Sequence, residues 1–293
     1  MRFLDVKTDF AFKKVFGSER SKPILINFLN ALLEYEGEHT ITDLTIIDPY
    51  QAPVIQGMKD TYVDVKAILA NGNSVIIEMQ VLNIEGFEKR VLYNATKAYA
   101  AQLDKGEQYT LLNPVIALTF TDFIMFRDHP DVVSRYKLLE TQTLAQYSDD
   151  VELIFIELPK FSQELAGLNN IHDKWIYFIK NAGKLDYIPD TLMMEPSINE
   201  AFGIANKAGL TEEELEAQEK RHDFIRLQRG SIEKALLDGK AEGKAEGLAE
   251  GAQEKALEIA RNLLDVLDDA TIAQKTGLQE AEIRQLRENG HKN

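Results

Sequence analysis

Residues 62–82 read YVDVKAILANGNSVIIEMQVL, two apolar and β-branched stretches separated by a short polar turn. Their alternation predicts strands over Tyr62–Leu69 and Ser74–Leu82. Asn71-Gly72 lies between them, and this dipeptide is the strongest short-range signal for a tight hairpin turn. The stretch therefore predicts an antiparallel hairpin, around which the other elements are arranged.

Charged and polar side chains share one face of this hairpin. Alternate residues of a strand point to the same side of a sheet, so Glu78 and Gln80 lie on one face of the second strand. On the first strand, Asp64 and Lys66 share a face in the same way. A carboxylate between apolar strand residues is costly to bury unless it is paired or bound to a metal ion. We therefore expect a functional site on this face.

The length of the loop decides whether the two carboxylates meet. A strict two-residue loop would pair residues whose numbers sum to 143, and Asp64 would then face Met79. A three-residue loop over residues 71–73, with a glycine bulge, gives a sum of 144. Asp64 then faces Gln80 and lies diagonal to Glu78, with Cβ atoms roughly 5–8 Å apart, close enough to share one ion. We predict this second register.

The rest of the first 195 residues mixes helical and extended patterns. Thr8 and Asp9 are candidate N-caps of a first helix that Gly17 ends, and a second helix begins near Ser21. The order of helix, three strands, helix and strand predicts an α/β or α+β fold. A stripe of core residues is expected on the second helix: Ile24, Phe28, Leu29 and Leu32. Further strands are predicted over 41–47, 114–121, 136–141 and 151–158, and further helices over 85–105, 173–181 and 197–208.

Composition excludes several classes of site. The chain has 293 residues and no cysteine, so disulfides and thiolate metal sites are excluded. Its five histidines are scattered without the spacing of zinc ligands. Neither a signal peptide nor an apolar run of about 18 residues is visible, which predicts a cytoplasmic protein without a membrane partner.

The net charge of −15 argues by itself against a nucleic-acid partner, because binding to phosphates depends on Lys and Arg. A local basic cluster near the N-terminus opposes this argument, although a solvated helix face would explain it equally well. The cluster consists of Lys7, Lys13, Lys14, Arg20 and Lys22.

The last third of the chain has a different character. Residues 196–265 are predicted to form a helical connector, and residues 266–293 a small helix-turn-helix-like tail around Gly277. Glycine recurs every fourth residue from Gly239 to Gly251, which is typical either of a polar linker or of a smooth stripe that another helix can approach. The acidic second helix of the tail favours homo-oligomerisation or docking over base recognition.

The spacing of Asp64 from Glu78-Met79-Gln80, on consecutive strands followed by a helix, resembles the PD-(D/E)XK nuclease motif. The resemblance narrows to the Rpn, or recombination-promoting nuclease, family and covers about residues 1–160. Its signatures are KTDFAFKKVFG at 7–17, DVK at 64–66, IEMQ at 77–80, and a helix with Arg90, Tyr93 and Tyr99 that leads to Gln102-Leu103 and 106–109. Gln80 departs from the superfamily pattern, which has Lys at this position.

The resemblance implies a restriction-endonuclease-like core, with a mixed central sheet flanked by helices, over residues 1–195. It also implies that Asp64 and Glu78 bind Mg²⁺ or another divalent cation, together with the Met79 backbone carbonyl. Gln80 would orient the attacking water by hydrogen bonding. Asp9 resembles an acidic position that the superfamily often adds to the site, although helix capping explains it as well.

Basic and polar residues on two helices are candidates for contact with DNA. Arg90, Asn94 and Lys97 follow helical spacing on one polar face, and Lys13 and Lys14 lie on the first helix. A solvated face is the alternative for each of them. The family implies a metal-dependent DNA endonuclease of low sequence specificity with a role in recombination. The rival hypothesis is a catalytically weak or inactive protein that binds DNA or assembles on a nuclease fold.

Overall fold

The computed structural model describes residues 2–51 and 60–290. The chain forms two compact units, the first ending at Arg226 and the second beginning at Leu227. The first unit extends beyond residue 195, the expected end of the nuclease-like domain. The reason is packing, because α6 (Pro196–Ile204) contacts α2 (Lys22–Leu33) and the first turns of α7 (Glu212–Leu263) bond to α1 (Asp9–Phe16).

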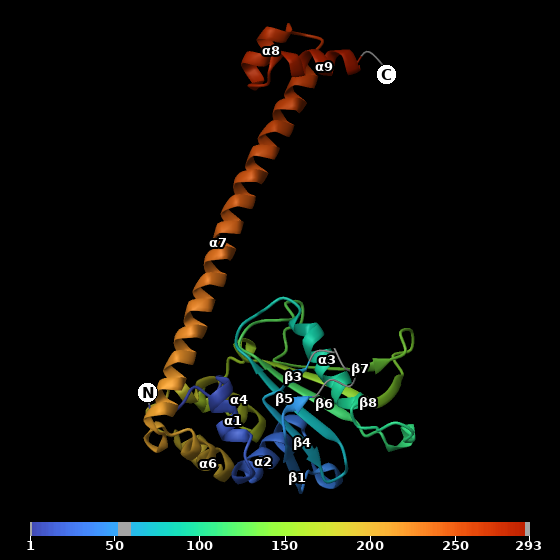
Figure 1. Ribbon diagram of the computed structural model, residues 1–293. Coiled ribbons are helices and arrows are strands. Elements are labelled where there is room, and N and C mark those ends of the chain that lie inside the picture. Colours follow the sequence, from blue (N-terminus) through green and yellow to red (C-terminus); the bar gives the residue numbers. More distant parts are fainter. Residues whose placement is uncertain (1, 52–59, 291–293) are drawn as a thin grey trace. The chain divides into compact units, whose positions relative to one another are not determined.

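A six-stranded mixed sheet forms the centre of the first unit (Figure 1). Strands β5, β6 and β8 run parallel, and the other neighbouring strands are antiparallel. This arrangement confirms the predicted α/β fold with a mixed central sheet. In spatial order the strands are β1 (Leu44–Ile47), β4 (Val65–Leu69), β5 (Ser74–Gln80), β6 (Val115–Thr121), β8 (Gln146–Glu157) and β7 (Val133–Leu139). A separate pair is formed by β2 (Tyr50–Gln51) and β3 (Thr61–Tyr62).

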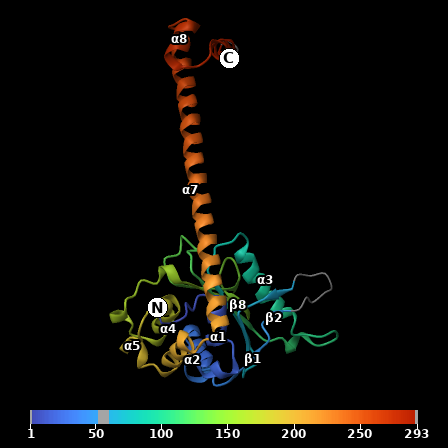
Figure 2. The ribbon, with the colours of Figure 1, turned by 60° about the vertical axis from the view of Figure 1, so that its left-hand side comes forward.

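Helices cover both faces of the sheet, and Figures 1 and 2 both place α3 (Phe87–Ala100) on the side opposite to α1 and α2. The larger core lies on the α1 side, where the ring of Phe28 is 4.4 Å from that of Phe16 and 5.4 Å from that of Trp175. The smaller core lies under α3 and contains Phe87 and Val91. The remaining helices of the first unit are α4 (Ile171–Asn181) and α5 (Asp190–Met193).

The sequence pattern explains the first two helices. Thr8 is the N-cap of α1, and its hydroxyl accepts a hydrogen bond from the Ala11 N–H. Pro23 lies in the first turn of α2, where its missing N–H leaves no helical bond unmade. The stripe predicted on α2 is confirmed, because Ile24, Phe28, Leu29 and Leu32 are all fully buried.

The central hairpin forms, but the predicted register is wrong: each residue of β4 pairs with a residue of β5 two positions before the predicted partner. Val65 pairs with Ile77, so paired numbers sum to 142 and not to 144. The loop has three residues as predicted, but they are 70–72, because the Leu69 N–H donates to the Asn73 carbonyl. Gly72 ends the loop at φ +89° in the bulge position. The sum stays even, so Lys66 still shares the face of Glu78 and Gln80. Asp64, which was predicted on that face, lies in a bulge before β4 and does not follow the alternation.

The helix after the hairpin is shorter than predicted. It ends at Ala100, and the positive φ of Gly106 (+96°) belongs to a later turn and not to the helix end. Its packing face also differs from the prediction: Leu92 is 49% exposed, whereas Asn94 and Lys97 are buried. The polar residues Asn94 and Lys97 therefore face the protein interior.

The second unit is a helical assembly with a small core of its own. After α7 come α8 (Asp269–Thr276) and α9 (Glu280–Gly290), with Gly277 between them at φ +77°, as the tail pattern predicts. Their core consists of Ala260, Ile272 and Ile283. The repeated glycines lie within α7, and their Cα atoms have open space around them. Across residues 2–51 and 60–290, none of the helices has the length and apolar character required to cross a bilayer.

Candidate active site

A β-bulge sets the position of Asp64. Val63 packs in the core under α3 and Val65 in the core on the α1 side, although residues two apart in a regular strand share a face. The Asp64 N–H donates to the Ile77 carbonyl at 3.0 Å, so Asp64 and Val65 both face Ile77. Bulges of this kind re-aim a side chain, and here the residue that is re-aimed is Asp64.

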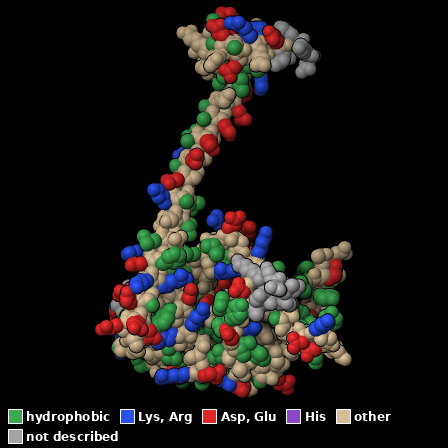
Figure 3. Space-filling view, viewed as in Figure 1, with side chains coloured by type: hydrophobic (Ala, Val, Ile, Leu, Met, Phe, Trp, Pro, Cys, Tyr) green, Lys and Arg blue, Asp and Glu red, His purple; other side chains and the backbone are tan. Residues whose placement is uncertain are grey.

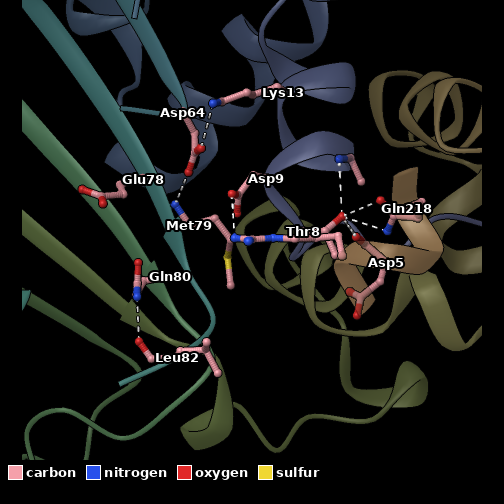
Figure 4. Close-up of polar contacts among 12 residues, drawn as sticks. Asp5, Thr8, Asp9, Lys13, Asp64, Glu78, Met79, Gln80, Leu82 and Gln218 are labelled. Atoms are coloured by element: carbon pink, nitrogen blue, oxygen red, sulfur yellow. Dashed lines mark hydrogen bonds and ion pairs between the residues drawn. The ribbon is translucent and has the colours of Figure 1, made fainter. Parts of the chain in front are cut away.

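The Asp64 carboxylate is held by both of its oxygens (Figure 4). Its Oδ2 accepts a hydrogen bond from the Met79 N–H at 2.8 Å, and its Oδ1 lies 3.5 Å from Lys13 Nζ. The side chain is only 11% exposed. Burial raises the pKa of Asp64 from 3.8 to about 6, and the charges of Asp9 and Glu78 add to this rise. These carboxylates therefore lie near enough to affect the ionisation of Asp64.

Glu78 lies on β5 and faces α3. Its Oε1 forms an ion pair with Arg90, and its Oε2 accepts a long hydrogen bond of 3.4 Å from Asn94. Burial raises the pKa of the Glu78 carboxyl, the Arg90 charge opposes this effect, and the charge of Asp9 raises the pKa further. Glu78 is thus a buried carboxylate near a second acidic group.

Gln80 is fixed at both ends of its amide. Its Oε1 accepts a hydrogen bond from Arg90 Nη2 at 2.7 Å, and its Nε2 donates to the Leu82 carbonyl at 2.6 Å (Figure 4). The same Arg90 nitrogen therefore joins Gln80 to Glu78. A Lys at this position would carry a positive charge of its own. Beside Gln80, the positive charge is that of Arg90 on α3.

Asp9 begins α1 and joins the site through charge. Thr8, and not Asp9, provides the capping hydrogen bond of the helix, so the capping explanation of Asp9 is unnecessary. Asp9 Oδ2 instead accepts a hydrogen bond of 2.8 Å from Arg221 Nη2, which belongs to α7. No sequence pattern predicts this contact, because 212 residues separate Arg221 from Asp9.

A family model described as "PD-(D/E)XK nuclease family transposase" matches residues 6–235, well over half of the chain. The chain belongs to this family. The match confirms the resemblance and spans Asp9, the hairpin and the turns of α7 that hold Asp9. No curated protein and no solved structure shows significant similarity to the chain.

The predicted DNA contacts of this PD-(D/E)XK chain do not form one surface. Lys97 is 4% exposed, and its ammonium donates to the Gln51 carbonyl at 2.7 Å. Asn94 is 1% exposed and bonds to Glu78. Asn94 therefore contacts the candidate site through Glu78, and Lys97 has its partner elsewhere in the interior. Lys13, whose side chain is 44% exposed, remains accessible beside Asp64.

Lys14 and Arg90 are already engaged in ion pairs. Lys14 lies 2.5 Å from Glu214 of α7, and its ammonium lies over the ring of Phe10. Arg90 pairs with Glu78, but a third of its side chain is exposed. Both residues neutralise carboxylates of the protein itself, so their charges reach a bound anion only in part.

Asp64 and Glu78 are the candidate ligands for a divalent cation. Among the residues that the structure describes, no group of three or more His, Asp or Glu side chains is arranged to hold a metal ion. The smaller set, Asp64 with Glu78, supplies carboxylate oxygens, which are the ligands that Mg²⁺ prefers. Burial and the Glu78 charge disfavour ionisation of Asp64, and a nearby cation would relieve this penalty. In its chemistry this pair of carboxylates fits a divalent cation.

Proposed function

We propose that the chain is a metal-dependent DNA endonuclease of low sequence specificity. The observation that carries this proposal is the position of two mostly buried carboxylates on neighbouring strands: Asp64, whose N–H donates to the Ile77 carbonyl, and Glu78, the residue that follows Ile77. Burial raises the pKa of both acids although each lies beside a cationic side chain, and perturbed acids of this kind cluster at functional sites. The family match supports a nuclease-like function.

In this proposal, Asp64 and Glu78 hold Mg²⁺ or another divalent cation with the Met79 carbonyl. Such an ion activates water and stabilises negative charge on a phosphodiester. Gln80, held in place by Arg90, orients the attacking water through its amide. Lys13 lies beside Asp64 and is accessible to the phosphate of the strand that is cut.

Low sequence specificity follows from the type of contacts proposed. Lys and Arg contacts to phosphates position DNA but carry no sequence information. On the face drawn in Figure 3, basic and acidic side chains are interspersed over the first unit, without a broad area of a single sign. We therefore expect DNA affinity to depend on a few local contacts and to fall steeply with salt.

A second candidate function is DNA binding or assembly without cleavage. The observation that favours it is the state of Glu78, whose two oxygens are engaged by Arg90 and Asn94. Gln80 also favours this second function, because it replaces the Lys of the superfamily and an amide cannot supply a positive charge at the phosphate. Both candidates require DNA binding, so the difference between them is catalytic.

Plasmid nicking separates the two candidates. Supercoiled DNA is incubated with the wild type, Asp64→Asn and Glu78→Gln, each with Mg²⁺ and with EDTA. We expect the wild type to nick the plasmid with Mg²⁺ only. In both variants the rate of nicking should fall by at least about 100-fold, which corresponds to the loss of one or more transition-state contacts. The control is Asp43→Asn, a carboxylate paired with Lys22 beside β1, which should keep full activity. Equal nicking by the wild type and Asp64→Asn would exclude the nuclease mechanism and leave DNA binding.

A further inference from the structure

A small basic cavity lies on the N-terminal side of α1. Its volume is about 230 Å³. Four segments of the chain form its wall: the N-terminal residues, the end of α4 with the turn η6 (Ala182–Lys184), the turn η7 (Lys207–Gly209) and the first turns of α7. Four lysines line it, namely Lys7, Lys180, Lys184 and Lys207.

The charge of this lining is opposite to that of the chain as a whole. Asp5 is its acidic residue, and Asp5 accepts a hydrogen bond of 3.2 Å from the Lys7 backbone N–H. Four lysines against Asp5 and against Asp122, which pairs with Lys7, leave an excess of two positive charges around the cavity, in a chain whose net charge is −15. A cavity lined by one sign of charge concentrates ions of the other sign.

Two of the four lysines have no partner in the described part of the chain. Lys7 forms an ion pair with Asp122 at 3.0 Å, and Lys180 donates to the Phe161 carbonyl. Within residues 2–51 and 60–290, the ammonium groups of Lys184 and Lys207 have neither a hydrogen bond nor an ion pair. Their charges are therefore free to act on a ligand.

The lysines are close enough to affect one another. Burial lowers the pKa of Lys180, and the charges of Lys184 and Lys7 lower it further. Converging ammonium groups repel in the absence of an anion, and an anion between them removes this repulsion. Asp122 opposes the shift only in part.

The cavity wall is built into the fold. A Cβ atom at Gly183 would lie 2.7 Å from the Cα of Asp5, so the two backbone segments touch and only glycine fits there. On the other side, His222 Nε2 lies 3.0 Å from Gln218 Nε2, and Gln218 hydrogen-bonds to the Thr8 hydroxyl. These contacts fix the cavity before any ligand arrives.

We propose that this cavity binds one phosphate group of the DNA strand, beside the site of cleavage; this inference rests on the proposed function. Several ammonium point charges around a small space suit a phosphate, which accepts from more than one donor at once. The cavity, with a volume of about 230 Å³, is large enough for a phosphate, and its lysines favour an anion.

The cavity lies close to the nuclease site. Lys7 lines the cavity and lies two residues before Asp9, whose charge raises the pKa of Asp64, and two residues span at most about 7 Å between their Cα atoms. Figure 4 shows Asp9 between the strand that carries Glu78 and the turn of Asp5 and Thr8. A strand whose scissile phosphate lies near Asp64 can therefore place a neighbouring phosphate in the cavity.

The test measures DNA binding without cleavage. All proteins carry Asp64→Asn and are kept in EDTA, and the affinity for a DNA duplex is measured by fluorescence anisotropy between 50 and 200 mM salt (about the range over which phosphate contacts are resolved). The double variant Lys184→Gln/Lys207→Gln should bind roughly tenfold more weakly, with a salt dependence lower by about one unit in the log–log slope. Lys184→Arg/Lys207→Arg should bind as the parent does, and so should the exposed control Lys105→Gln.

A second arm uses inorganic phosphate as the probe. In the proposal, millimolar phosphate competes with DNA in the parent and competes less in the double glutamine variant. If that variant binds DNA with the affinity and salt slope of the arginine variant, the proposal is wrong. If it loses only the effect of phosphate and keeps its DNA affinity, the cavity serves a free phosphate and the proposal is also wrong. If the wild type fails to nick plasmid but the lysine effect persists, cleavage is excluded, and of this inference only the binding of a DNA phosphate in the cavity stands.

Discussion

Replacing Asp64 by Asn should stabilise the cation-free protein, and the gain should depend on pH. Asn keeps a side-chain oxygen that can accept the Met79 N–H but carries no charge. The carboxyl of Asp64 titrates at a pKa of about 6 in the folded chain against 3.8 as its ordinary value. This difference corresponds to a penalty of ~3 kcal/mol on the ionised carboxylate in the folded state.

The sign of the pH dependence follows from the direction of the shift. Below pH 3.8 the carboxyl is protonated in both states, so its charge has no effect on stability. Between 3.8 and about 6 the unfolded chain loses its proton first, and the wild type loses stability as pH rises. Above about 6 the full penalty is present. The advantage of Asp64→Asn should therefore be small near pH 3.5 and reach its maximum above pH 7.

Urea unfolding in EDTA, followed by the fluorescence of Trp175, measures this advantage. Trp175 is the single tryptophan of the chain and is fully buried, so its emission reports the first unit. Asp43→Asn is the control, because its Lys22 partner lowers the pKa of Asp43 and its removal should give no gain at high pH. Equal stability of Asp64→Asn and the wild type at pH 7.5, or a less stable variant, would show that the carboxylate is not under electrostatic stress.

Three further predictions concern other parts of the chain. Arg90→Gln should destabilise the first unit by about 1–3 kcal/mol in urea, because Glu78 loses its charged partner; an unchanged midpoint would show that the pair is already solvated. Gly72→Ala should cost about 1–2 kcal/mol, because Gly72 has φ +89° and a Cβ would lie 2.7 Å from Asn113 Oδ1; combining it with Asn113→Ala should recover the steric part only. Gly243→Ala should stabilise the exposed α7 by about 1 kcal/mol in a thermal melt followed by circular dichroism, and no gain would indicate that a partner helix requires the glycine.

Sequence periodicity was sufficient for the hairpin and for the stripe of α2, because both depend on local alternation and on residues close in the chain. The register could not be predicted from the alternation alone, because it depends on which loop residue adopts the positive φ. Gly72 was expected at the middle of the loop and lies at its end. The bulge at Asp64 was also invisible, because it results from pairing with Ile77 and not from residue type.

The face of α3 shows a second limit of sequence patterns. Asn94 and Lys97 are polar, so helical spacing places them on a solvated side. In the structure they are buried because Glu78 and the Gln51 carbonyl supply partners for them inside the protein. Only the three-dimensional arrangement shows that a polar residue has a buried partner. The ion pair of Asp9 with Arg221 could not be predicted from the sequence for the same reason.

The bonds from Gln218 to Thr8 and from Arg221 to Asp9 join chain segments more than 200 residues apart. During synthesis, which proceeds from the N-terminus, α1 leaves the ribosome long before the turns that hold it. A nascent chain that has completed the sheet would carry Asp64 and Glu78 while Asp9 still lacks its anchor. The third acidic group is thus fixed last, and a polypeptide released too early would have the hairpin acids without it.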